Sequence, residues 1–525
     1  MNCGRPLLFA VVIAIAVQTE GQQPLRIGKV TVHALDVYSS QEAEHGPAYR
    51  LADRLHIETR QSVIRRFLLF REGDIYRPQR LAETERNLRA LGFLKSAAVT
   101  ASTPHDGLVN VTVTTQDAWS IAPETQAGMK GGTATYGASI SDNNLLGYGK
   151  QVDLGWDKGV DRTRFALNYN DPAFFAPYWR AHFDYGINSD GYDHRFSVRR
   201  PFYSFATPWT TEFSFTGFRQ NDRLFSHGIE TDRFRQKHDE MIAGYGVALD
   251  PNDGSANRIT GGLRFVNDDF ETLPAHSPIG LPAEREFRYL FVKFDRAQND
   301  YLKLNFVNKD LRYEDFNLGT HTIFEAAVSP KALGLDSTTG LLRFAAGSGA
   351  RFGEKSIVMP SVELSTRLNG GVQNAIAGGS LLYVMRSDTD SPQALVGRVL
   401  MNAGWRLDRE AQFFADGATG LRGYRLHSFA GSRSIVFNLE ERVYLGREVL
   451  QLVSPAVVAF VDSGNATYRG LSDLMALKTD IGVGIRIGLP RTPKNLLRMD
   501  FAYALNRDPL GHGGWTISFS SGQAF

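Results

Sequence analysis

The most informative stretch of this 525-residue sequence is residues 437–445, Phe437-Asn438-Leu439-Glu440-Glu441-Arg442-Val443-Tyr444-Leu445. Polar and apolar side chains alternate along it, except at Glu441. Because successive side chains of a β-strand point to opposite faces, one face of this segment would be polar and the other apolar. We therefore expect a strand that separates water from an apolar environment. Glu440 would point to the water side, and Glu441 would interrupt the apolar side.

The same two-residue period recurs from about Trp119 to the end of the chain. Clear examples are Gln151–Trp156, Arg164–Tyr169, Arg180–Tyr185, Thr211–Phe215 and Arg258–Phe265. Beyond the N-terminal segment no run of about 18 apolar residues occurs, which excludes membrane-spanning helices. Strands of about ten alternating residues are typical of transmembrane β-barrels instead. By this pattern there are up to roughly twenty candidate strands.

Aromatic residues cluster at the ends of these runs. The two clearest groups are Phe174, Phe175, Tyr178 and Trp179, and Phe202, Tyr203, Phe205 and Trp209. In a barrel they would form the girdles at the membrane surfaces. A soluble β-sandwich could use them as core, but about 400 residues of strands without helices would be large for one sandwich. We predict an all-β transmembrane barrel over residues 118–525.

Residues 1–21 are typical of a secretory signal peptide. Arg5 supplies the positive start, Pro6–Val17 the apolar centre and Thr19–Gly21 a cleavage site. A buried N-terminal helix is the alternative interpretation. The only cysteine, Cys3, precedes the apolar centre, so we expect no disulfide and no cysteine metal site in the mature chain.

The composition argues against several other functions. The formal net charge is +2 and no basic run occurs, which gives no basis for nucleic-acid binding. The histidines lack metal-ligand spacing, and no Gly-x-Ser-x-Gly nucleophile motif appears. We therefore predict no catalytic residue, no metal site and no cofactor.

Residues 22–117 read as a small α+β domain of strand, helix, helix, strand and strand. Its predicted elements are a strand at Ile27–Ala34, a helix capped by Thr59, a helix opened by Pro78, and strands at Lys95–Ala101 and Leu108–Thr115. The run from Val63 through Gly73-Asp74-Ile75-Tyr76 to Leu91-Gly92-Phe93 resembles a POTRA domain, the periplasmic module that precedes barrels of the BamA/TamA superfamily. The polar stretch at residues 36–56 departs from that family, whose first strand usually reaches its first helix by a shorter path.

Motifs in the barrel region extend the resemblance. Asp142–Gly149 and Asn170–Phe174 resemble two turns near the start of these barrels. At the other end, Trp515, Ile517 and Phe519 alternate towards Phe525, which is similar to the C-terminal β-signal of exported barrels. The family often carries several POTRA domains, whereas only one fits this sequence. The resemblance implies about sixteen barrel strands, fewer than the alternation predicts.

The candidate site is Gly420-Leu421-Arg422-Gly423-Tyr424. It resembles the arginine motif at the tip of a loop that folds back into the lumen, and Phe460–Gly464 resembles the acidic strand motif that follows. The resemblance implies an ion pair between Arg422 and Asp462. Alternation adds Glu440 as a second acceptor. Both faces around Asp462 are apolar, so its direction stays open, and an ordinary turn acid is the alternative.

The resemblance implies a protein of the bacterial outer membrane with its POTRA domain in the periplasm. It would assist the insertion or translocation of polypeptides without a chemical step. Its partners would be outer-membrane lipids and unfolded or secreted client polypeptides. Periplasmic chaperones or accessory lipoproteins would be further partners. A secretion channel dedicated to one partner protein and a passive or lipid-handling pore are the alternatives.

Overall fold

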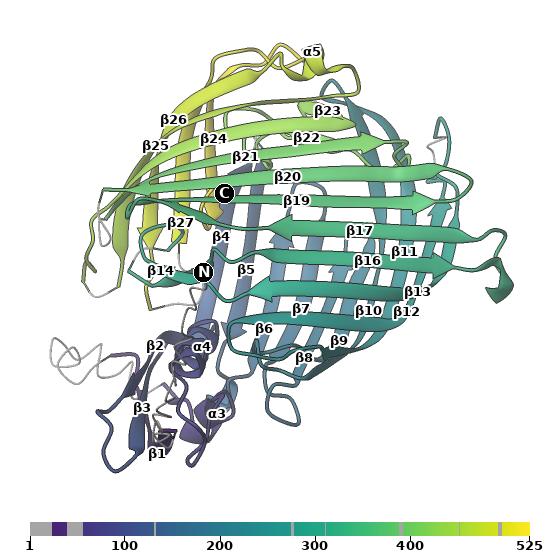
Figure 1. Cartoon of the computed structure of the whole chain (residues 1–525). Coiled ribbons are helices and arrows are strands. Elements are labelled where there is room, and N and C mark those ends of the chain that lie inside the picture. Colours follow the sequence, from purple (N-terminus) through teal and green to yellow (C-terminus); the bar gives the residue numbers. More distant parts are fainter. Residues whose placement is uncertain are drawn as a thin grey trace, which may run out of the picture.

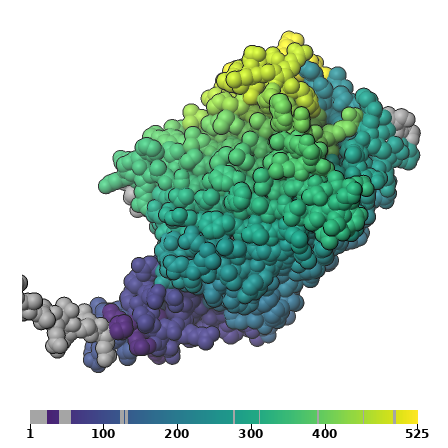
Figure 2. Space-filling model, turned by 45° about the vertical axis from the view of Figure 1, so that its right-hand side comes forward, coloured from purple at the N-terminus to yellow at the C-terminus, as the bar shows by residue number. Residues whose placement is uncertain are grey.

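The computed structural model describes residues 24–38, 56–130, 133–274, 278–309, 311–387, 392–450, 452–491 and 496–525. Figure 1 shows a large barrel with a small α+β domain below one end. The space-filling view confirms that this domain, in purple, lies directly against the barrel (Figure 2). We call this the near end of the barrel and the opposite one the far end. The predicted signal peptide lies outside the described residues.

The small domain contains the five predicted elements. They are β1 (Arg26–Leu35), α3 (Gln61–Arg65), α4 (Pro78–Arg89), β2 (Leu94–Ala101) and β3 (Leu108–Asp117). The sheet order is β1-β3-β2, so β2 is an edge strand. Both helices bury apolar residues against this sheet, with Ile64 and Leu88 fully buried. The prediction that Thr59 caps α3 is wrong: Arg60 is the N-cap residue, and the Thr59 hydroxyl donates to Asp117 instead.

The barrel is one antiparallel sheet. Its strands are β4 (Ile121–Lys130), β5 (Thr133–Asp142), β6 (Gln151–Lys158), β7 (Thr163–Asp171), β8 (Arg180–Asn188), β9 (Gly191–Arg200), β10 (Trp209–Ser226), β11 (Ile229–Ala248), β12 (Ser255–Glu271), β13 (Arg285–Gln298), β16 (His321–Ser329), β17 (Thr339–Gly347), β18 (Ala350–Phe352), β19 (Ser356–Leu368), β20 (Val372–Arg386), β21 (Gln393–Trp405), β24 (Arg433–Tyr444), β25 (Ser454–Thr467), β26 (Lys478–Gly488), β27 (Leu496–Ala504) and β28 (Gly514–Ser521). Consecutive strands pair around the wall, and β28 meets β4 to close it.

Among the described residues the wall has twenty strand positions, because β18 continues β17 along β19. This agrees with the alternation and exceeds the sixteen strands that the resemblance implies. Hairpins can be added to a barrel by widening its circumference, without changing how the other strands pair. The alternation of residues detects each strand separately, so it can give the number of strands. The family motifs do not fix that number.

The remaining elements lie at the ends of the barrel or inside it. At the near end, residues 299–320 form the near-end segment, with the hairpin β14 (Tyr301–Leu304) and β15 (Glu314–Asn317). At the far end, residues 406–432 form the lumen loop, with β22 (Phe413–Ala415) paired to β23 (Phe429–Gly431). The short elements η1 (Leu145–Gly147), η2 (Lys331–Leu333) and α5 (Leu471–Leu474) lie in turns. None of the described helices has the length and apolar character needed to cross a membrane.

Candidate functional site

The lumen loop places Arg422 against the inner wall. Its turn is organised by Asp416, whose carboxylate accepts hydrogen bonds from the backbone N–H groups of Ala418 and His427. Leu421 and Tyr424 pack with buried apolar residues of β24, β25 and β27. A Cβ on Gly423 would lie 2.6 Å from the Cβ of Asp480. Glycine is therefore required there if the loop is to approach the wall this closely.

The guanidinium of Arg422 binds both predicted acids. Its Nε and Nη2 atoms donate to the two oxygens of Asp462 at 2.7 and 2.8 Å. Nη1 donates to Oε1 of Glu440 at 2.6 Å. The ring of Phe460 lies 3.4 Å below the guanidinium carbon. Arg422 is 2% exposed and both acids are 0% exposed, so these ion pairs are shielded from bulk water.

The structure extends this pair into a network that the sequence did not predict. Glu440 also accepts from Arg442 at 2.7 Å and from Arg486 at 3.0 Å. Arg486 in turn donates to Asp500 on β27 at 2.6 Å. These side chains come from β24, β26 and β27 and are fully buried. The alternation of Arg486 with Ile485 and Ile487 could have placed it in the lumen, but only the register between strands brings it to Glu440.

The same network contacts the near-end segment. Arg442, which binds Glu440, also donates to the carbonyl of Val307 at 2.7 Å, and the Tyr444 hydroxyl donates to the same carbonyl at 3.0 Å. Val307 is fully buried against Val384 and Val396 on the inner face of the wall. Glu440 therefore lies between two arginines, one holding the lumen loop and the other holding the near-end segment.

The β14–β15 hairpin of the near-end segment is bound by the small domain. Arg89 of α4 makes a bidentate pair with Asp315, at 3.0 Å from Nε and 2.6 Å from Nη2. Lys303 pairs with Glu85 of α4 at 3.1 Å. Charge-assisted bidentate bonds fix orientation as well as distance. The segment thus forms a bridge from α4 into the lumen.

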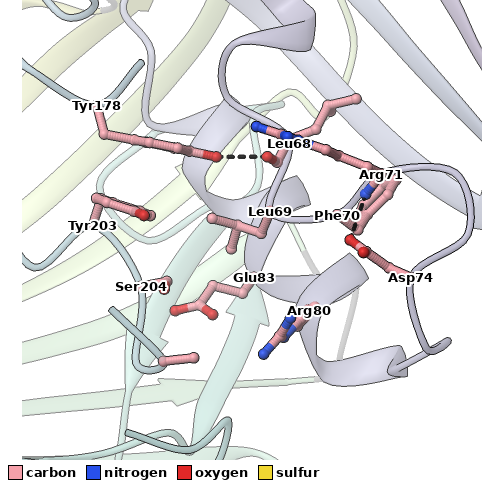
Figure 3. A pocket seen from close by; sticks show the side chains of 11 residues that line it. Leu68, Leu69, Phe70, Arg71, Asp74, Arg80, Glu83, Tyr178, Tyr203 and Ser204 are labelled. Carbon is pink, nitrogen blue, oxygen red and sulfur yellow. Dashed lines mark hydrogen bonds between the residues drawn. The ribbon is translucent and has the colours of Figure 1, made fainter. Parts of the chain in front are cut away.

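A small cavity lies between the small domain and two barrel turns. It has a volume of about 220 Å³ and is lined by Leu68, Arg71, Glu83, Tyr178 and Tyr203, among others (Figure 3). The Tyr178 hydroxyl donates to the carbonyl of Leu68 at 2.5 Å. Glu83 accepts a hydrogen bond from the backbone N–H of Phe205 at 2.9 Å. These contacts anchor α4 and the loop before it to the near end of the barrel.

A second anchor is a buried chain of hydrogen bonds at the junction. His56 lies 3.1 Å from the Ser120 hydroxyl and 3.0 Å from Asp117. The order Ser-His-Asp is that of a hydrolase triad. The His56 side chain is 1% exposed, however, and Asp117 also accepts from the backbone N–H and hydroxyl of Thr59. This arrangement joins the small domain to the start of the barrel.

The predicted β-signal residues do not all share one face. On β28, Trp515 and Ile517 point outward, at 73% and 39% exposure, while Ser518 is buried. The chain turns at Gly522, with φ of 78°, and Phe525 then lies inside the barrel. Its ring packs near Arg398 and Arg442. Phe525 therefore leaves the outward row that Trp515, Ile517 and Phe519 begin.

One family model and several solved structures match this chain. Residues 56–116 match the family model described as POTRA, surface antigen variable number repeat. The chain is similar to CdiB from Acinetobacter baumannii (TM-score 0.48, 12% identity, 95% of this chain and 74% of that chain). It is also similar to CdiB from Escherichia coli (0.44, 12%, 98% and 92%) and to BamA from Haemophilus ducreyi lacking POTRA domains 1–3 (0.34, 11%, 94% and 84%).

A search of curated proteins finds no match. No group of three or more histidine, cysteine or acidic side chains suited to a metal ion occurs within the described ranges. The predicted combination of a POTRA domain with a β-barrel is confirmed.

Replacing Arg422 tests the central ion pairs. Arg422→Ala should lower the free energy of unfolding by about 3 to 5 kcal/mol, because it leaves the Asp462 charge buried without its cation. Arg422→Lys should recover only part of this loss, since an ammonium cannot hold two carboxylates in the same plane. Urea unfolding of the folded barrel measures both. The control is Arg425→Ala in the same loop, an exposed residue 3.1 Å from His512, which should change stability by less than about 0.5 kcal/mol.

The buried carboxyl of Glu83 should make the stability of the small domain depend on pH. Burial raises the pKa of its carboxyl, with partial opposition from the Phe205 N–H and Arg86. The folded state then binds the proton more tightly than the unfolded state, so wild-type stability falls as pH rises from the unfolded pKa through the folded pKa. Glu83→Gln should therefore raise the thermal unfolding temperature at neutral pH and have little effect in acid. An equal shift at every pH, or the same behaviour in the exposed control Glu58→Gln, would contradict this.

Proposed function

We propose that this protein is an outer-membrane barrel that assists the insertion or translocation of polypeptides. The observation that carries the proposal is the seam between β28 and β4. Among the described residues, the register across it consists of Phe519 with Met129. The neighbouring ladder of β27 and β28 runs unbroken from Leu497 with Ser521 to Ala504 with Gly514. A seam whose described register is a single residue pair can part at lower cost than a complete ladder, and so can expose strand edges to a client.

The POTRA domain supports this role. Its edge strand β2 pairs with β3 on one side, and the backbone N–H of Val99 on the other side is held by Glu85 at 3.0 Å. An extended polypeptide can add to such an edge by backbone hydrogen bonding, with little demand on its sequence. Lys303 of the near-end segment pairs with the same Glu85. A client that displaced Glu85 from the edge would also loosen one tie of the near-end segment.

The two segments that lie inside the barrel argue against the alternative of a passive pore. A passive pore for small solutes needs an open channel, whereas here the lumen loop and the near-end segment both pack on the inner wall. We place the near end and the POTRA domain in the periplasm, where clients would arrive.

Depletion of the protein from its native cell, followed by quantitative outer-membrane proteomics, tests the function. Loss of many barrel proteins is expected for a general insertion factor, and loss of one secreted protein for a dedicated channel. Rescue should fail with Met129→Cys/Phe519→Cys under oxidising conditions and return with reductant, because the disulfide closes the seam.

The matched control for the seam is Val483→Cys/Phe501→Cys, which links two strands that already share a full ladder. It should rescue under both conditions. An unchanged outer-membrane proteome after depletion would reject the proposal and favour a pore or lipid handling. Full rescue by the oxidised seam variant would reject the parting of β28 from β4 but would leave the insertion or translocation role in place.

The near-end segment should limit the ion conductance of the barrel. Replacing residues 301–317 by a short Gly-Ser turn should raise single-channel conductance in planar bilayers, because it removes Val307 and its neighbours from the lumen. Replacing the far-end turn at residues 330–338 in the same way is the control and should leave conductance unchanged. Equal, high conductance of the wild-type protein and the shortened variant would instead indicate a passive pore.

A further inference from the structure

The outer wall of the barrel has a hollow of about 540 Å³ across β21 and β24 to β28. Its lining includes Leu439, Glu441, Ala459, Val461, Val483 and Trp515. This volume lies within the range of small-molecule sites, roughly 300–1,000 Å³. All but one of these side chains are apolar or aromatic, and Glu441 is the exception.

The hollow exists because a small residue lies among large ones. Ala459 on β25 is the cross-strand partner of Glu441 on β24 and of Val483 on β26. Leu439, Val461 and Val483 project from the outer face around it, with exposures of 46%, 44% and 58%. A methyl group between longer side chains leaves space at the wall surface.

Glu441 is the residue at which the sequence departs from strict alternation. It is half-buried on the outer face, three residues from the near end of β24. Its Oε1 accepts one hydrogen bond, from Gln393 at 2.6 Å. A carboxylate on an apolar outer face is costly, and a neutral amide does not neutralise it. The hollow therefore presents a negative charge at one place on an apolar surface.

We propose that the hollow binds an acyl chain of a phospholipid whose primary ammonium headgroup pairs with Glu441. This inference rests on the proposed membrane location. The position of Glu441 near the strand end places its charge at the level of headgroups, while Ala459 and Val461 contact the chain. An anionic headgroup would be repelled by Glu441. A client strand is not the proposed occupant, because β21 and β24 to β27, which carry most of the hollow, are paired on both sides and offer no free edge.

The bound lipid would lie beside the seam. Trp515 belongs to β28, whose other neighbour is β4. The site would thus keep one lipid next to the strands that the proposed function requires to part.

Native mass spectrometry of the whole chain tests the site. The protein is first inserted into vesicles containing equal amounts of phosphatidylethanolamine and phosphatidylglycerol, and then extracted in mild detergent. Wild-type protein should retain phosphatidylethanolamine in excess. Glu441→Gln should lower that excess several-fold, because the amide cannot pair with the ammonium. Ala459→Leu, which fills the hollow and keeps the charge, should lower retention of both lipids.

Glu286→Gln is the matched control. Glu286 is also on the outer face but is 50% exposed and pairs with Arg288 within its own strand, so this change should leave retention as in wild type. Compact mobility of unheated protein on gels verifies that each variant is folded. Equal retention by wild type and Glu441→Gln, or an excess of phosphatidylglycerol, would overturn the lipid site while leaving the proposed function intact. Failure of the wild-type barrel to insert into vesicles would overturn both.

Discussion

The burial of the Arg422 guanidinium is the constraint on which the interior of this barrel depends. A cation that is 2% exposed must find acceptors within the wall, and it does so in Asp462 and Glu440. Each acid then requires its own complement of donors, which Asn438 supplies to Asp462 at 2.7 Å. The loop tip therefore cannot shift without leaving several buried charges unpaired. In this way one arginine fixes the tip of a loop whose base is held to the wall by other ion pairs, such as Asp408 with Arg367 and Arg409 with Asp232.

Glu440 makes the network a link between the two ends of the barrel. One of its oxygens faces Arg422 and the lumen loop, and the other faces Arg442, which holds Val307 of the near-end segment. From there the chain of contacts continues through Asp315 to Arg89 of the POTRA domain. A disturbance at α4 and a disturbance at the loop tip thus act on the same carboxylate. The contacts from α4 to the loop tip are therefore contiguous.

Sequence reasoning succeeded where the signal is local. The alternation around Glu440 gave its direction correctly, and the helix and strand patterns gave all five elements of the POTRA domain. It could not orient Asp462, because both flanking faces are apolar, and it missed Arg486 and Asp500. Whether two inward side chains meet depends on the register between strands, which a single strand does not encode. The path of Phe525 was missed for a related reason, since the backbone turns at Gly522 and ends the alternation.

Glu440 and Glu441 show that the same side chain has different partners on the inner and outer faces of the wall. They are neighbours in sequence, yet Glu440 is fully buried among three arginines and Glu441 lies on the outer face with one amide. On the inner face the protein can supply every counter-charge from neighbouring strands and loops. On the outer face an arginine would itself have to be accommodated in lipid, at a cost that falls from about 2 to 4 kcal/mol at mid-membrane to about 0 to 1 kcal/mol near the interface. A lipid ammonium avoids that cost because its headgroup is already at the interface. A carboxylate for which the chain supplies no cation can therefore pair with a cation of the bilayer.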